Sequence, residues 1–455
     1  MLKTRTRLFV AVTVAALAAA PAALAQSLTD ALIASYRNSG LLEQNRAVLR
    51  AADEDVAQAV AALRPVLNWA ASLDYAEPAR GADNTSGSVG LSASMLLYDF
   101  GRSQLGVDAA KESVLSARET LKSVEQQVLL RGVAAFLGLR RENAFVQLRA
   151  NNVRLITQQL EAARDRFEVG EITRTDVSIA EARLAAAQSG LAAAEGARAR
   201  AVEEYRAATG TIPTALRPPP PAPATASNLA DAKAIAVQTH PDIKRAQRDV
   251  AAAELGVLIA AGAVRPRLTG TAGLNVDDDG DDSTSFGLNL SGPIYQGGQL
   301  SSLTRQAQAR RDTARSGLLT TRLDIEQAVG NAWANLNVAA ASRRASDEEV
   351  RAARLALRGA REEFEVGART TLDVLDLEQE LLDAETNLIA ADIDRNLAVY
   401  QLLSAMGLLS VEHLELGIAT YDPAAYYNAV ENAPTGLVSP QGEKLDRVLR
   451  SLNRN

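Results

Sequence analysis

Two stretches of the chain alternate apolar and polar residues with a period of two, and turn-forming residues bound each stretch. In the first, the apolar positions run from Leu67 to Tyr75 and again from Val89 to Leu97. The second repeats the pattern from Leu268 to Val276 and from Phe286 to Ile294. This period is typical of β-strands with one apolar face. We predict two hairpins, with strands at about residues 65–77 and 88–98, and at about residues 266–276 and 285–295.

A long stretch without proline follows each hairpin. Residues 101–209 and 298–406 are rich in Ala, Leu, Glu, Arg and Gln, which favour helix. Gly170 and Gly367 interrupt the two stretches at positions typical of helix C-terminal caps. Mostly heptad spacing of apolar residues before each glycine indicates coiled-coil packing. We predict a long helix and an antiparallel returning helix in each stretch, at about residues 101–169 and 171–209, and at about residues 298–366 and 368–406.

The two halves of the chain are copies of one another. Residues 166–177 match residues 363–374 around a shared Phe-Glu-Val-Gly, at an offset of 197 residues, and Pro65 matches Pro266 at an offset of 201. Spacing that holds over about a hundred residues is improbable by chance. We divide the chain into a first structural repeat at residues 26–212 and a second at residues 228–408. A proline-rich linker at residues 213–227 joins them, and a C-terminal tail at residues 409–455 is expected to be partly disordered.

Residues 1–25 have the features of a secretory signal peptide. Lys3, Arg5 and Arg7 precede an apolar run, and Ala23-Leu24-Ala25 forms a small-residue cleavage pattern. The apolar run is shorter than the roughly 20 residues of a membrane-spanning helix. We therefore expect the mature protein to leave the cytoplasm.

Charge and composition exclude several functions. The net charge is −7, and it becomes −10 when the three cations of the signal peptide are removed, which makes nucleic acid a poor partner. The absence of cysteine excludes disulfides, thiolate metal sites and lipid attachment through cysteine. We find no nucleophile elbow and no phosphate-binding glycine loop, so we predict no catalytic residues, no enzymatic activity and no cofactor.

Two features resemble metal or proton-transfer sites and are better explained otherwise. Asn275, Asp277 and Asp279 match the first ligand positions of a calcium-binding loop, but Phe286 stands at the twelfth position, where such a loop requires glutamate. We interpret this segment as a solvated acidic loop. His240 and His413 stand in unrelated contexts, which favours capping or surface positions. No metal site is predicted.

The hairpins and the helices together decide between two classes of protein. Four strands cannot close a barrel, which takes about eight at least, whereas three copies supply twelve. The strands alone would also allow a soluble β-sandwich, and the heptads alone would allow a soluble periplasmic coiled-coil adaptor or scaffold. Such an adaptor has no reason to carry apolar strand faces at matching points of both halves. The fold class predicted is therefore an α+β membrane protein, internally duplicated, with four strands per chain in a trimeric 12-stranded outer-membrane β-barrel and a long antiparallel α-helical tunnel.

The chain resembles the TolC-like outer-membrane efflux and type I secretion proteins over about residues 28–408. The segments that carry the resemblance are Leu97–Gly101, Pro293–Gly298 and Val366–Asp376. It implies a homotrimeric channel in the outer membrane of a Gram-negative bacterium, in contact with lipid and extending into the periplasm. It also implies a passive conduit that a periplasmic adaptor and an inner-membrane ABC or proton-driven transporter open.

Asp373 and Asp376 are the candidate pore residues. They are three residues apart, just after the turn between the two helices of the second repeat, and so lie on one face of the returning helix. Threefold symmetry would make six carboxylates, which would attract cations at a constriction. On the residues alone, an equal alternative is that both are first-turn acids favoured by the helix dipole. The resemblance implies that they form the constriction at the periplasmic entrance.

Other site residues follow from the resemblance alone. It implies an ion pair between Arg369 and Asp176 of neighbouring copies, which holds the entrance shut. Exposed ion pairs contribute little stability, so this pair suits a gate that a partner can open more than a permanent closure. Gly170 and Gly367 would mark the helix-turn tips for adaptor docking. Phe364 stands where family members often have tyrosine, which removes one gate hydrogen bond, and a packing role for it is an equal alternative.

Overall fold

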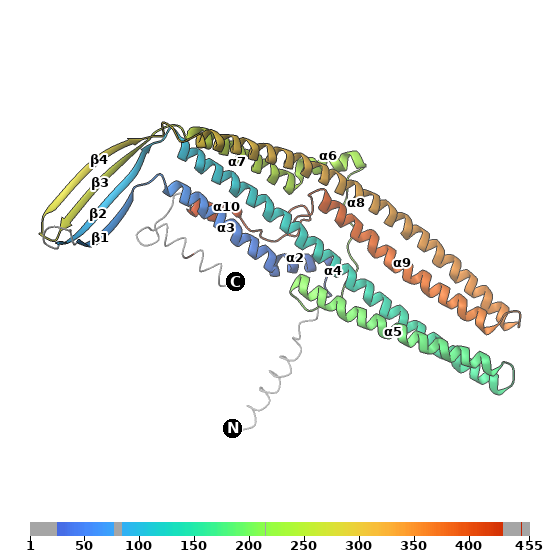
Figure 1. The fold of residues 1–455 in the computed structure, drawn as a ribbon. Helices are drawn as coiled ribbons and strands as arrows, with labels where there is room; N and C mark the ends of the chain where they lie inside the picture. The colour runs from blue at the N-terminus through green and yellow to red at the C-terminus, as the bar shows by residue number, and fades with distance from the viewer. Residues whose placement is uncertain (1–24, 77–83, 214, 431–446, 448–455) are drawn as a thin grey trace, which may run out of the picture. The chain divides into compact units, whose positions relative to one another are not determined.

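The computed structural model describes residues 25–76, 84–213, 215–430 and 447 (Figure 1). The predicted signal peptide lies outside these residues except for its last position, and so does most of the turn between the first two strands. The proline- and glycine-containing end of the tail also lies outside them.

Both repeats have the same order of elements, two helices, a β-hairpin, a long helix and a returning helix. In the first repeat these are α2 (Leu28–Asn38), α3 (Gly40–Ala61), β1 (Val66–Ala76), β2 (Asn84–Tyr98), α4 (Arg102–Glu168) and α5 (Arg174–Thr209). In the second they are α6 (Leu229–Thr239), α7 (Pro241–Gly262), β3 (Arg267–Asp277), β4 (Asp282–Ser291), α8 (Gln299–Glu365) and α9 (Thr371–Ala405). A short helix, α10 (Pro423–Val430), follows in the tail.

The four strands form one antiparallel sheet in the order β1-β2-β3-β4, so the hairpins of both repeats join edge to edge (Figure 1). Because directly paired residues share a face, the register separates the side chains into two sets. Trp69 pairs with Leu91, which pairs with Leu274, on the apolar face. Ser72 pairs with Ser88 on the other face, and their hydroxyl oxygens lie 3.0 Å apart.

The apolar face of the sheet is exposed in the single chain. The side chains of Trp69 and Phe286 are 76% and 83% exposed. A continuous exposed apolar surface of this kind is rare on soluble proteins and marks contact with a membrane or another protein. The alternation predicted from the sequence is therefore present, with the small and polar residues together on the opposite face.

The two long helices contain 67 residues each. The corner that leads into α4 takes left-handed backbone at Phe100 (φ 59°) and Gly101 (φ 80°). The carboxylate of Asp99 then accepts hydrogen bonds from the backbone N–H and the hydroxyl of Ser103, at 2.8 and 2.5 Å. These bonds satisfy first-turn groups that have no partner within the helix.

The chain folds into two compact units, and neither of them is one repeat. The first unit takes in residues up to Leu42, Glu125–Ala236 and Glu326–Ile418. The second takes in Glu43–Val124, Val237–Ile325 and residues from Ala419 on. Each unit combines matching parts of both repeats, because α4 and α8 pass from one unit into the other.

In the first unit, α2 packs closely on α4. A Cβ atom on Gly132 would lie 2.6 Å from the hydroxyl of Ser35, so a larger residue here would force Ser35 to shift. The linker is tied to the same unit, because the N–H of Gln26 donates to Ala215 and its carbonyl accepts from Arg217. The start of the tail is packed as well, since Leu409 and Val411 are buried.

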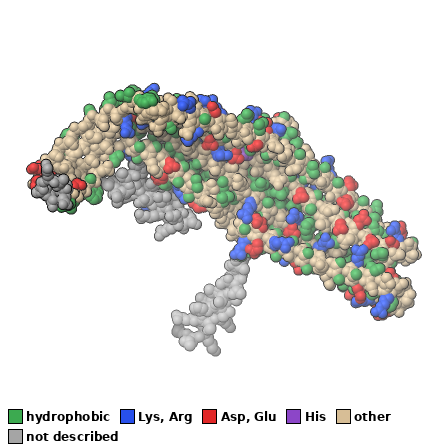
Figure 2. Space-filling model, in the orientation of Figure 1, with side chains coloured by type: hydrophobic (Ala, Val, Ile, Leu, Met, Phe, Trp, Pro, Cys, Tyr) green, Lys and Arg blue, Asp and Glu red, His purple; other side chains and the backbone are tan. Residues whose placement is uncertain are grey.

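None of the helices in the described ranges has an apolar stretch long enough to cross a membrane. On the face in Figure 2, acidic and basic side chains are interspersed over the helices.

Candidate functional site at the helical turns

Two helix–turn–helix hairpins of the first unit, α4–α5 and α8–α9, carry the residues predicted to form the site. Each turn has a glycine in left-handed backbone, Gly170 at φ 80° and Gly367 at φ 77°. The N–H of Gly170 donates to Phe167 at 3.0 Å, and that of Gly367 donates to Phe364 at 3.0 Å. Both glycines have open space around the position of a Cβ atom, so backbone conformation and not crowding makes glycine necessary here.

Asp373 caps the N-terminus of α9. Its carboxylate accepts from the backbone N–H of Thr370 at 2.9 Å and from the Thr370 hydroxyl at 2.7 Å, while the hydroxyl accepts from the N–H of Asp373. These hydrogen bonds, aided by the charge of Arg369, lower the pKa of Asp373. Asp373 is therefore ionised at neutral pH. Asp176 makes the same capping box with Thr173 at the start of α5, and its pKa is lowered for the same reason.

Asp376 lies one turn further along α9 and takes no part in the cap. Its carboxylate accepts a hydrogen bond from the guanidinium of Arg183 on α5. This ion pair joins the returning helices of the two repeats. The sequence analysis did not predict this ion pair. The sequence does contain a signal for it, because neither charge is present at the equivalent position of the other repeat: Asp376 corresponds to Ile179, and Arg183 corresponds to Glu380.

Within the chain, the two residues of the predicted gate ion pair have other partners. The guanidinium of Arg369 donates to Glu363 at 2.5 Å, and Asp176 is bound to Thr173. The hydrogen bond to Glu363 raises the pKa of Arg369, which stays charged. A pair between Arg369 and Asp176 of different copies remains a prediction, as does the position of the two pore aspartates in a lumen.

A further carboxylate near the turn, that of Glu378, was not predicted. Glu378 on α9 is 3% exposed and accepts from the guanidinium of Arg361 on α8 at 2.7 Å and from the side-chain amide of Gln159 on α4. The equivalent pair in the first repeat, Arg164 and Glu181, has the same 2.7 Å bond but is exposed. Within the single chain, the bond from Gln159 has no counterpart at the first pair, because Ala356 occupies the equivalent position.

A cavity of about 240 Å³ lies between the two hairpins, next to this carboxylate. Phe364 and Arg166 border it from opposite hairpins, with the guanidinium carbon 4.6 Å from the ring centre. This cation–π contact supports a packing role for Phe364 between the hairpins.

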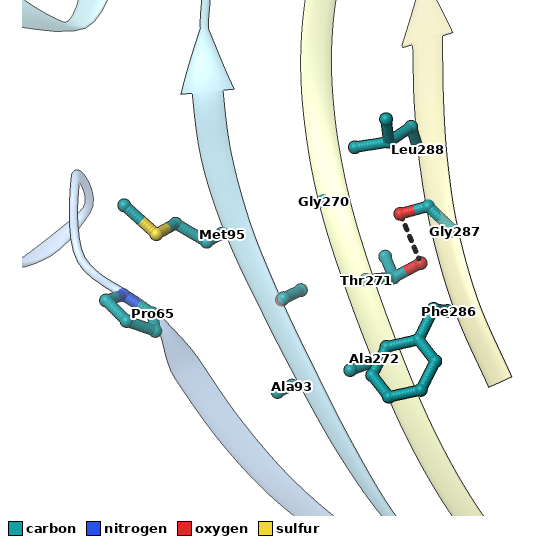
Figure 3. A pocket seen from close by; sticks show the side chains of 10 residues that line it. Pro65, Ala93, Met95, Gly270, Thr271, Ala272, Phe286, Gly287 and Leu288 are labelled. Atoms are coloured by element: carbon teal, nitrogen blue, oxygen red, sulfur yellow. Dashed lines mark hydrogen bonds between the residues drawn. The ribbon is translucent and has the colours of Figure 1, made fainter. Parts of the chain in front are cut away.

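A larger hollow of about 610 Å³ lies on the sheet (Figure 3). Ala93 and Gly270 belong to its floor, and Met95, Phe286 and Leu288 project around them. The hydroxyl of Thr271 donates to the carbonyl of Gly287 at 3.4 Å. None of the lining residues is ionisable, so the hollow has no acid–base chemistry to offer.

The acidic turn between β3 and β4 and the histidines take structural positions. Asp277 accepts from the N–H of Asp281 at 2.8 Å, which closes the turn on itself. Among the described residues there is no cluster of three or more side chains able to hold a metal ion. His240 is the N-cap of α7, where its Nδ1 accepts from the N–H of Asp242, and burial lowers its pKa. The predicted capping role of His240 is confirmed.

Comparison with known proteins decides what kind of molecule carries these turns. The model of the outer membrane efflux protein family matches residues 32–211 and 234–408, one segment in each repeat. The chain belongs to the outer membrane efflux protein family.

Curated relatives and solved structures agree with this assignment. The outer membrane efflux protein BepC of Brucella suis is 35% identical, over 92% of this chain and 94% of BepC. The outer membrane protein TolC of Vibrio cholerae is 27% identical, over 85% and 92%. The crystal structure of VceC from Vibrio cholerae superposes with a TM-score of 0.72 at 22% identity, over 84% of this chain and 96% of VceC.

Membership of the outer membrane efflux protein family confirms the predicted fold class, the outer-membrane location and the role as an export channel. The comparisons give no support to the alternative of a soluble periplasmic adaptor. The family is one of transport proteins, and the absence of enzymatic activity stays a prediction.

Proposed function

We propose that three copies of this chain form one export conduit, with a periplasmic gate made by Asp373 and Asp376 of each copy. The observation that carries the assembly is the sheet: it has an exposed apolar face, a small-polar face and two edges, β1 and β4. Unpaired edges do not persist in lipid, because their backbone groups have no water to bond. Pairing β4 of one copy with β1 of the next would remove every edge.

Assembly and location are tested together. The protein should fractionate with the outer membrane and should migrate on unheated gels as a trimer that heating dissociates. A monomer in the soluble periplasmic fraction would contradict the proposal.

The geometry of α9 supports the gate. Asp376 is exposed, lies on the same face as Asp373 and makes no bond to the helix backbone that would tie it down. Asp373 is ionised through its cap. Three copies would bring six carboxylates together, the three of Asp376 each paired with Arg183, and a ring of carboxylates attracts cations.

Opening of the gate would break exposed ion pairs. Arg369 is free to leave Glu363 because both side chains are solvent-exposed, and an exposed pair is weak. Arg183 and Asp376 would part when the two returning helices separate. A gate built from several weak contacts can be opened by a partner that binds the helical turns at Gly170 and Gly367.

The gate is tested by conductance in planar bilayers. Asp376→Ala should reduce the preference for cations, and the double variant with Asp373→Ala should reduce it further. Asp30→Ala is the control, because it removes a carboxylate from the same kind of capping box at the start of α2, outside the helical turns. Unchanged selectivity in the double variant would show that these carboxylates do not face the lumen.

The partners would be a periplasmic adaptor and an inner-membrane ABC or proton-driven transporter, which supply the energy that a passive channel lacks. For cargo, BepC is named an efflux protein and AprF of Pseudomonas aeruginosa an alkaline protease secretion protein, so efflux of small molecules is tested against type I secretion of proteins. A strain without this gene should become sensitive to toxic small molecules while its secreted proteins stay unchanged. Loss of a secreted protein with unchanged sensitivity would favour the secretion role instead.

A further inference from the structure

A short segment of the tail, Tyr421–Val430, covers one face of the second unit, and we name it the C-terminal strap. It contains α10 and lies on α3 and α4. The side chains of Tyr426 and Val430 are buried against Ala57, and the hydroxyl of Tyr426 donates to Glu54 at 2.6 Å. Tyr421 and Tyr427 pack on the cluster of Leu49, Val56 and Val114.

Asp53 on α3 is buried in the surface that the strap covers. It is 0% exposed, and neither oxygen of its carboxylate has a hydrogen-bond partner in the described part of the chain. A charged carboxylate in such a place is costly, since water is lost and no hydrogen bond replaces it. A neighbouring copy cannot supply a partner, because the chain itself already encloses the side chain completely.

The second repeat shows what this pair of positions does without a strap. At the offsets of 201 and 197 residues, Asp53 corresponds to Glu254 and Arg118 to Arg315. Arg315 donates to Glu254 at 2.6 Å, and both side chains are about half exposed. In the first repeat the strap holds the guanidinium of Arg118 over the ring of Tyr427, 5.3 Å from its centre, and Asp53 receives no bond. The first repeat therefore has a buried acid beneath the strap where the second repeat has a half-exposed ion pair.

We propose that the C-terminal strap is an acid-stabilised cover on α3 and α4, seated most firmly when Asp53 is protonated and loosened when Asp53 ionises. Release would expose the apolar cluster beneath Tyr421 and Tyr427. It would also allow Arg118 to reach the carboxylate, as Arg315 reaches Glu254 in the second repeat.

The charged and titratable groups around Asp53 come from all three packed elements. They are Arg46, Arg50 and Glu54 on α3, Arg118 and Glu119 on α4, and Tyr421 and Tyr426 on the strap. Burial raises the pKa of Asp53 to about 6, against the opposing effect of Arg118 and with a smaller contribution from Glu54. Since the folded pKa lies above the ordinary 3.8, the stabilisation is full below pH 3.8 and is lost as the pH rises through about 6. The equilibrium should favour the seated strap about tenfold more at pH 5 than at pH 7.

The test is hydrogen–deuterium exchange on the full-length trimer in detergent at pH 5 and pH 7, corrected for intrinsic exchange rates. Peptides from the C-terminal strap should be protected about tenfold more at pH 5, whereas peptides from α7 should not change. Asp53→Asn should keep the strap protected at both pH values. Asp55→Asn, an exposed neighbour on the same helix, should keep the wild-type response.

Two outcomes would overturn the proposal: equal protection of the wild-type strap at both pH values, or an unchanged pH response in Asp53→Asn. If Asp53→Asn does not yield trimer, Arg118→Gln serves instead. Losing the cation should raise the pKa of Asp53 and move the midpoint of protection to higher pH. A midpoint that stays in place, or falls, would show that Asp53 does not control the strap.

Discussion

Asp373 and its repeat equivalent Asp176 show that one side chain can have a local role and a role in assembly. Both close capping boxes at the start of a returning helix, so the local explanation of a first-turn acid is correct for each of them. That explanation does not exclude a pore role, because the cap keeps the carboxylate ionised. Asp376 has no capping bond, so its position and its pairing with Arg183 have no such local explanation.

Thr370→Val should weaken the cap that holds the charge of Asp373. Without the hydrogen bond from the Thr370 hydroxyl, the pKa of Asp373 should rise part of the way toward its ordinary value, because the backbone N–H of residue 370 still donates to the carboxylate. A carboxylate with a lowered pKa contributes stability above its ordinary pKa and loses it as the pH falls through the folded value. Cation selectivity of Thr370→Val channels should therefore disappear at a higher pH than in the wild type, as measured by reversal potentials. Thr173→Val should loosen α5 equally and leave this midpoint where it is.

At the scale of elements, the two helical hairpins share the same turn backbone and differ in the side-chain contacts that join their helices. Both turns use a left-handed glycine and a Thr–Asp capping box. Within the single chain, only the second hairpin buries the carboxylate of its Arg–Glu pair, which also accepts a hydrogen bond from Gln159 of α4. The repeat pattern therefore predicts the turns, whereas the side-chain contacts that join the helices depend on how the two repeats pack on each other.

Replacing a turn glycine should destabilise its hairpin. Gly367→Ala forces a side chain into left-handed backbone at a cost of about 1 kcal/mol. Gly359→Ala, inside α8 with open space at the Cβ position, should be neutral or stabilising. Thermal unfolding of the two trimers compares them directly, and a Gly367→Ala protein as stable as Gly359→Ala would refute this account of the turn.

The buried ion pair should be more strongly coupled than its exposed equivalent. Removing Arg361 and Glu378 singly and together should give a coupling free energy of about 2 kcal/mol, because Glu378 is left without water when its partner goes. The same double-mutant cycle on Arg164 and Glu181 should give about 0.5 kcal/mol, since both side chains are solvated. Equal couplings in the two cycles would mean that burial of Glu378 has no energetic consequence.

For the whole molecule, the sheet faces determine where the protein can reside. Leu91 and Ser92 are neighbours on β2, both are exposed, and they point to opposite faces of the sheet. One face is apolar across all four strands, and the other is small and polar. In the proposed assembly they become the lipid-facing and lumen-facing surfaces.

A charge placed on either face distinguishes the two surfaces. Leu91→Arg should reduce the amount of trimer in the outer membrane, because a lipid-facing arginine costs about 2–4 kcal/mol near the bilayer midplane. Ser92→Arg should assemble normally and lower the single-channel conductance. Membrane fractionation and bilayer recording supply the two measurements, and the opposite pattern would mean that the faces have been assigned the wrong way round.

The sequence alone determined the features that repeat at short range or along the whole chain. Strand alternation, proline-free helical stretches and the turn glycines each follow from the period or the backbone preference of neighbouring residues. The duplication then predicts the same order of elements in both repeats, and the motif around Asp373 carries the resemblance to the family. The local cap of Asp373 also follows from the sequence, because an acid in the first turn of a helix can be recognised there.

Only the tertiary structure decided what side chains far apart in the sequence do to one another. The bond of Arg183 to Asp376, the burial of Glu378 beneath Gln159 and the enclosure of Asp53 by the strap all join residues from different repeats or from the tail. No period in the sequence encodes such contacts, since they depend on which helix faces come together and how much water is excluded between them. Equivalent residues of the two repeats consequently differ in exposure and in bonding, although their local sequences match.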